Sequence, residues 1–127
     1  MVYPCTQTDY TSNTKFKSVI KNSGKSILTK ESLRDYMSLY LSKPKDYNNK
    51  FVNLLKNNWL FNYPKTIIIT GTQDPLHDEG VELKNKLERF SVYVNHLDIE
   101  NAKHGFLTSI IDQKYTDNTI EFLKKYL

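Results

Sequence analysis

The sequence predicts an α/β fold with about three parallel strands and flanking helices, and the clearest evidence lies in its second half. Residues 66–70 read Thr-Ile-Ile-Ile-Thr, a β-branched run typical of a strand covered on both faces. A helical pattern follows, in which Leu83, Leu87 and Phe90 share one face, and residues 91–97 are again β-rich. Two strands joined by a helix of that length are expected to lie parallel, with a right-handed crossover.

The first half of the chain has weaker patterns. Pro4 would stop a very short first strand, and the polar stretch after it has no periodicity. Thr29 precedes a helical spacing of apolar residues that ends before Pro44, so it is expected to cap a helix. The other expected elements are a strand at 1–4, an irregular connection at 5–28, a helix from Thr29 to Leu41, a shorter helix at about 48–57, and a last helix from about Thr116 with Ile120, Leu123 and Leu127 as its apolar stripe.

The composition is that of a single globular domain of 127 residues with a net charge of +4. The lysines are scattered and the only arginines are Arg34 and Arg89, so no concentrated basic face for nucleic acid is indicated. Cys5 is the only cysteine, which excludes an internal disulfide and argues against a cysteine-ligated metal. No apolar stretch approaches the ~18 residues needed to span a bilayer, and no signal sequence opens the chain, so we expect a cytoplasmic protein.

Two side chains stand out where the predicted strands end. Asp74 lies four residues past the first of the two clear strands, and His104 lies about seven past the second. Loops that leave the carboxyl ends of neighbouring parallel strands meet at one edge of the sheet. A carboxylate placed there can accept the Nδ1–H of an imidazole and stabilise its cation. The alternative is that Asp74-Pro75 simply opens an ordinary turn, and that His104-Gly105 forms another.

Both loops also carry family motifs. Residues 74–80 read Asp-Pro-Leu-His-Asp-Glu-Gly, and residues 104–106 read His-Gly-Phe. In this order they resemble α/β-hydrolases of the hormone-sensitive-lipase-like class, which include esterases and lipases. The resemblance implies that Asp74 is the acid and His104 the base of a catalytic triad, acting on a small-molecule ester.

The resemblance covers nearly the whole chain and implies a particular domain organisation. Val2-Tyr3-Pro4 is similar to the family's sixth strand, and residues 29–41 are similar to part of its cap. We therefore expect residues 1–127 to form the C-terminal portion of an α/β-hydrolase domain. Its parts would be a strand at 1–4, a connection with cap-like helices at 5–63, and a strand-helix-strand-helix unit at 64–127.

The nucleophile of such an enzyme is missing from this sequence. The four glycines, Gly24, Gly71, Gly80 and Gly105, bracket no serine in a Gly-x-Ser-x-Gly pattern, and no His-Gly-Gly-Gly element is present. In the family both precede the sixth strand. We therefore expect a truncated or split hydrolase that is inactive alone and takes its serine from outside this chain; in the split case a second chain would supply it. The alternative is a non-catalytic remnant that serves as a binding module.

Other candidate sites in the sequence are weak. Ser23 and Ser26 flank Gly24, but no strand precedes them, and a phosphate-binding loop would need glycine at position 19, which is valine. His77, His96 and His104 have no recognisable metal-ligand spacing. His77 and His96 are expected to be surface or packed residues, and neither a metal nor a cofactor is expected.

Overall fold

Two parallel strands form the centre of the protein. The computed structural model describes residue 10, residues 13–108 and residues 113–126. Strand β1 (Thr66–Gly71) pairs with β2 (Val94–Ile99), with Thr66 opposite Val94 and Gly71 opposite Ile99. The predicted parallel arrangement is confirmed for these two strands, and the strand expected at residues 1–4 lies outside the described residues.

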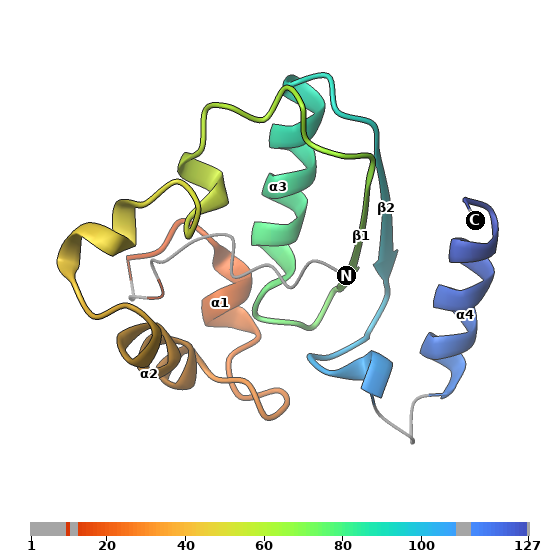
Figure 1. Ribbon diagram of the computed structural model, residues 1–127. Coiled ribbons are helices and arrows are strands. Elements are labelled where there is room, and N and C mark those ends of the chain that lie inside the picture. The colour runs from red at the N-terminus through yellow and green to blue at the C-terminus, as the bar shows by residue number, and fades with distance from the viewer. Residues whose placement is uncertain (1–9, 11–12, 109–112, 127) are drawn as a thin grey trace.

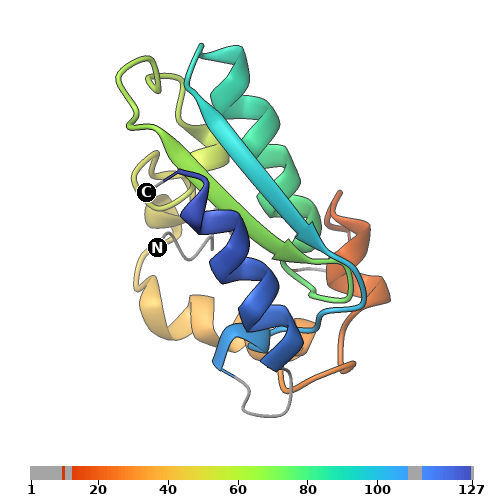
Figure 2. The ribbon, with the colours of Figure 1, turned by 90° about the vertical axis from the view of Figure 1, so that its right-hand side faces the viewer.

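Helix α3 (His77–Arg89) joins the two strands and covers one face of the sheet, while α4 (Gln113–Lys124) covers the other (Figures 1 and 2). The α3 side has a core of Leu60, Ile68, Leu83, Leu87 and Val92. The approach of α3 to β1 requires Gly80, because a Cβ there would lie 2.6 Å from Thr70 Cγ2. None of the helices in the described ranges is long and apolar enough to cross a membrane.

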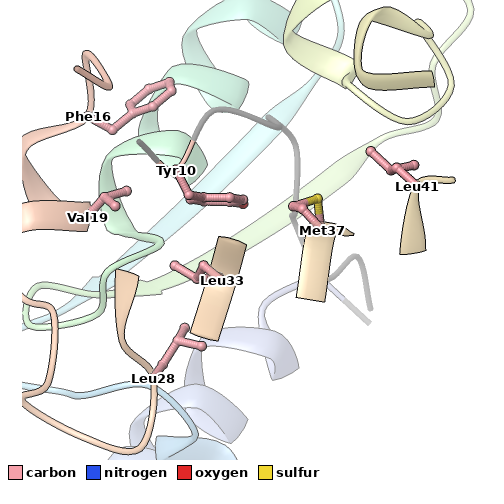
Figure 3. Close-up of a cluster of buried hydrophobic side chains, with 7 residues drawn as sticks. All are labelled: Tyr10, Phe16, Val19, Leu28, Leu33, Met37 and Leu41. Carbon is pink, nitrogen blue, oxygen red and sulfur yellow. The ribbon is translucent and has the colours of Figure 1, made fainter. Parts of the chain in front are cut away.

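The two helices of the first half of the chain, α1 (Lys17–Lys21) and α2 (Lys30–Tyr40), share a second hydrophobic core beside α3. Helix α2 is confirmed, and so is its cap: Thr29 Oγ1 accepts from Ser32 N, and Ser32 Oγ accepts from Thr29 N, each at 3.0 Å. The short helix α1 packs against α3 and joins this core through Val19. Figure 3 shows the shared cluster, which contains Tyr10, Phe16, Val19, Leu28, Leu33, Met37 and Leu41.

Two predictions for the first half were wrong. The stretch at 5–28 is not wholly irregular, since α1 lies within it and buries Val19 completely. The helix expected at about 48–57 is replaced by two 3-10 turns, η1 (Pro44–Asn48) and η2 (Leu54–Lys56). Asparagine side chains explain the second error: Asn49 Oδ1 accepts from Phe51 N and Asn57 Oδ1 from Trp59 N, and such local bonds compete with a helix.

The second half matches the predicted order of elements, with shifted boundaries. Strand β2 starts at Val94 instead of residue 91, because Ser91 takes a left-handed conformation (φ 58°) that ends α3 in a tight turn. Helix α4 starts three residues earlier than expected. Its buried residue is Thr119, whereas Ile120 is 44% exposed, so the predicted apolar stripe was wrong at that position. Leu127 lies outside the described residues.

Candidate active site

The loop between β1 and α3 presents Asp74 at the carboxyl edge of the sheet. It turns tightly, since Asp74 N donates to Gly71 O at 3.0 Å and His77 N donates to Asp74 O at 3.1 Å. Leu76 N donates to Asp74 Oδ1 at 2.8 Å, which fixes the carboxylate within its own turn. Asp74 is only 8% exposed, and one of its two carboxylate oxygens, Oδ1, is already bound within the turn.

The loop after β2 closely crosses the segment 72–78, which carries Asp74 and is called the acid loop below. Gln73 N donates to Ala102 O at 3.0 Å, and Asn101 N donates to Thr72 Oγ1 at 2.9 Å. At the crossing, a Cβ on Gly71 would lie 2.5 Å from Ala102 O, a distance shorter than almost any Cβ contact observed in proteins. Glycine at position 71 therefore permits the two loops to touch.

The crossing brings His104 to Asp74. His104 Nδ1 lies 2.9 Å from Asp74 Oδ2, and the side chains are 27% and 12% exposed. An ionised carboxylate only accepts hydrogen bonds, so Nδ1 carries the proton and Nε2 is the basic nitrogen of the neutral ring. Nε2 has no hydrogen bond within the described part of the chain. The pair therefore has the geometry of an oriented general base whose reactive nitrogen is open.

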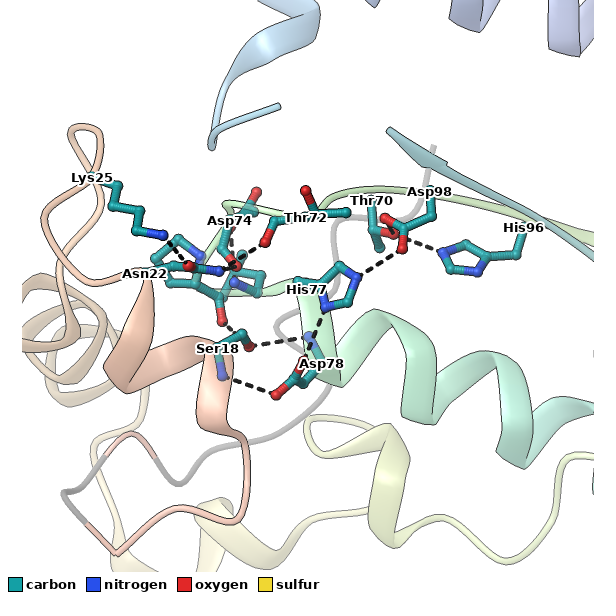
Figure 4. Close-up of polar contacts among 12 residues, drawn as sticks. Ser18, Asn22, Lys25, Thr70, Thr72, Asp74, His77, Asp78, His96 and Asp98 are labelled. Atoms are coloured by element: carbon teal, nitrogen blue, oxygen red, sulfur yellow. Dashed lines mark hydrogen bonds and ion pairs between the residues drawn. The ribbon is translucent and has the colours of Figure 1, made fainter. Parts of the chain in front are cut away.

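His77 lies in a separate charged network at the start of α3. Its Nδ1 is 2.9 Å from Asp78 Oδ1, and its Nε2 is 3.0 Å from Asp98 Oδ2 (Figure 4). Burial lowers the pKa of His77, but the hydrogen bonds and charges of Asp98 and Asp78 outweigh it and leave the pKa raised. Because His77 hydrogen-bonds to Asp78 on α3 and to Asp98 on β2, it connects the start of the helix to the end of the strand, which is a structural role.

His96 is also a packed residue. Its Nε2 lies 2.7 Å from Thr70 Oγ1, and that hydroxyl donates to Asp98 Oδ1 at 3.1 Å. Since the hydroxyl has one proton, His96 Nε2–H is the donor to Thr70. Burial lowers the pKa of His96, which keeps the ring neutral. Among the described residues, no three His, Cys, Asp or Glu side chains gather in a way that could hold a metal ion.

Two residues that touch the acid loop have no motif that singles them out in the sequence. Ser18 and Asn22, both on or next to α1, hydrogen-bond to the segment 72–78 (Figure 4). Their only sequence signal is a spacing of four in a polar stretch, which by itself does not distinguish them from solvated residues. Ser23, one of the two serines that flank Gly24, accepts a hydrogen bond from Lys30 N at 2.9 Å.

Comparison with known proteins identifies the family. A family profile described as "alpha/beta hydrolase fold" matches residues 1–108. The chain belongs to this family. Mouse (Mus musculus) arylacetamide deacetylase is 38% identical over 52 residues, which are 41% of this chain and 13% of that protein. The resemblance to esterases and lipases of the α/β-hydrolase family is therefore confirmed.

Solved esterase structures share the α/β-hydrolase fold of the chain. An esterase of the archaeon Pyrobaculum calidifontis superposes with a TM-score of 0.77 at 23% identity, over 94% of this chain and 40% of its own. A fungal esterase from Rhizomucor miehei gives 0.80 at 22% identity, over 98% of this chain and 39% of its own. The chain thus spans about two fifths of the length of these esterases.

Proposed function

We propose that this α/β-hydrolase chain supplies the acid and the base of a serine-dependent carboxylic-ester hydrolase. The observation that carries the proposal is the 2.9 Å contact between His104 Nδ1 and Asp74 Oδ2, while no residue in the described ranges hydrogen-bonds to His104 Nε2. His104 Nε2 would take the proton of a serine hydroxyl while the serine oxygen attacks the ester carbonyl. It would return that proton to the departing alcohol, while Asp74 stabilises the imidazolium formed in between.

We further propose that the serine comes from outside these 127 residues and that the chain alone is inactive. No Gly-x-Ser-x-Gly or His-Gly-Gly-Gly pattern occurs in the sequence, so neither an elbow serine nor the usual oxyanion-hole amides are available. Loss of the nucleophile removes the covalent step, and loss of the oxyanion hole removes most of the residual rate. A longer polypeptide or a second chain would provide both.

The proposal is tested with short-chain p-nitrophenyl esters. We expect the chain alone to give no turnover above background and no covalent labelling by a fluorophosphonate. When it is combined with a segment that carries the Gly-x-Ser-x-Gly elbow, turnover should appear, vanish in His104→Ala and fall by about 10⁴-fold in Asp74→Asn. His96→Gln is the matched histidine control and should keep the activity. Turnover by the chain alone that disappears in His104→Ala would contradict the need for an external serine, and activity independent of His104 would contradict its role as the base.

A non-catalytic binding module is the second candidate, and the missing nucleophile is the observation that favours it. The coding sequence adjacent to this chain separates the two. A neighbouring or continuous reading frame that encodes His-Gly-Gly and Gly-x-Ser-x-Gly supports the hydrolase. Its absence supports the module.

A further inference from the structure

Helix α1 contacts the acid loop across fifty residues of sequence. Asn22, at the C-cap of α1, is 2% exposed. Its Nδ2 donates to Thr72 O at 3.1 Å and to Asp74 O at 3.0 Å, so one amide bridges two carbonyls of the turn that carries the acid (Figure 4). The second of these carbonyls belongs to Asp74 itself.

The orientation of the Asn22 amide follows from its surroundings. Lys25 Nζ donates to Asn22 Oδ1 at 2.9 Å. If the amide were rotated by half a turn, its oxygen would face two carbonyl oxygens, with no donor between them. Its NH₂ would face an ammonium group, with no acceptor between them. Both donors of Asn22 are therefore directed at the acid loop.

Ser18 binds the same loop one helical turn earlier. Its Oγ donates to Pro75 O at 2.8 Å and accepts from Asp78 N at 3.1 Å, while Ser18 N donates to Asp78 Oδ2 at 2.9 Å. Ser18 is 4% exposed. The acid loop is thus held on both sides of the Asp74 side chain, by Asn22 at positions 72 and 74 and by Ser18 at positions 75 and 78.

We propose that Asn22 and Ser18 are positioning residues that hold Asp74 Oδ2 against His104 Nδ1. This rests on the proposed function, in which that contact orients the base. Residues 72–76 form a turn between β1 and α3, so the direction of the Asp74 side chain depends on where these carbonyls are anchored. A catalytic group needs a supporting set of contacts that keeps it within about 0.5 Å of its working position.

The test measures the tautomer of His104 directly. In the ¹⁵N-histidine-labelled chain, at a pH about two units above the ordinary histidine pKa of about 6.5, the ring nitrogens report the ratio of Nδ1–H to Nε2–H. Hydrogen bonding to Asp74 makes Nδ1–H dominant in the wild type. A hydrogen bond to a charged group is strong enough that its loss shifts such a ratio about tenfold. We expect the ratio of Nδ1–H to Nε2–H to fall by about threefold or more in Asn22→Ala and in Ser18→Ala. In Ser18→Thr, which keeps the hydroxyl, the ratio should stay at the wild-type value.

Controls separate positioning from general stability. Val19→Ala removes buried volume from the same helix without a bond to the acid loop, so it should lower the melting temperature and leave the ratio unchanged. Asn58→Ala, at an exposed asparagine, should change neither. If Asn22→Ala does not fold, Ser18→Ala decides the question by the same threshold. Lys25→Ala is then the control: it removes only the partner of Asn22 Oδ1, keeps both bonds to the acid loop and should leave the ratio unchanged.

The outcomes distinguish this inference from the function on which it rests. Asp74→Ala defines the ratio without the acid. If the wild type already equals Asp74→Ala, the acid–histidine pairing of the proposed function fails. If the two differ but Asn22→Ala and Ser18→Ala both stay within about threefold of the wild type, the positioning inference alone is overturned. A fall in Val19→Ala as large as that in Asn22→Ala also overturns it.

Discussion

Replacing Gly71 by alanine should push apart the two loops that carry Asp74 and His104. The added methyl carbon would lie 2.5 Å from Ala102 O and 2.9 Å from Ala102 C, both of them backbone atoms. Ordinary contact begins at 3.4 Å, so the carbonyl oxygen would have to retreat by roughly 0.9 Å. Overpacking of this kind costs about 1–3 kcal/mol. The movement also disturbs the 3.0 Å bond from Gln73 N to Ala102 O, worth about 0.5–1.5 kcal/mol.

We therefore expect Gly71→Ala to lower the free energy of unfolding by about 2–4 kcal/mol, measured by urea denaturation with circular dichroism. The His104 tautomer ratio should shift in the same variant, because the contact to Asp74 lengthens. Gly24→Asn is the control, since no atom lies within 4 Å of a Cβ there and asparagine tolerates its φ of +74°. A loss below about 0.5 kcal/mol with an unchanged tautomer ratio would refute the close crossing of the two loops.

Other perturbations test the rest of the fold. Thr29→Ala removes the capping hydroxyl of α2 and should cost about 1 kcal/mol in urea denaturation; no loss would contradict the capping box. Leu87→Ala, at a fully buried position, should cost about 2–5 kcal/mol, whereas Leu39→Ala, 81% exposed, should stay within about 0.5 kcal/mol, and equal effects would contradict the assigned core. The raised pKa of His77 means that its stabilising contacts are complete below about pH 6.5 and are lost as the pH rises through the raised value. The stability difference between the wild type and His77→Gln should therefore shrink with rising pH, and a pH-independent difference would refute the charged network.

Elements with strong local signals were predictable from the sequence. The β-branched run at 66–70 and the helix behind it depend on side-chain periodicity, and the structure has β1 and α3 there. The cap at Thr29 depends on a hydrogen bond to Ser32, three positions away, and α2 begins directly after Thr29 as expected. Helix α1 has no side-chain cap and no acidic residue in its first turn. Its packing through Val19 stabilises it, and that contact has no local signature.

The environment of polar residues was not predictable in the same way. Glu79 fits the acidic start of a helix, yet it is completely buried and accepts a hydrogen bond from Tyr10 OH at 3.2 Å. Asn22 lies in a polar stretch, yet it is 2% exposed. Burial of a polar side chain depends on partners that are distant in sequence, and here those partners lie 50 to 69 residues away.

Three features could be predicted from the sequence alone: the order of the parallel unit, the edge at which its loops emerge, and the candidate residues Asp74 and His104. These follow from short-range periodicity and from the rule that loops after parallel strands share an edge. The folded structure was needed to show that the two side chains meet at 2.9 Å, that Gly71 lets their loops cross, and that α1 binds the acid loop. Such contacts join backbone carbonyls and side chains that are far apart in the sequence, and no periodic pattern of residues indicates them.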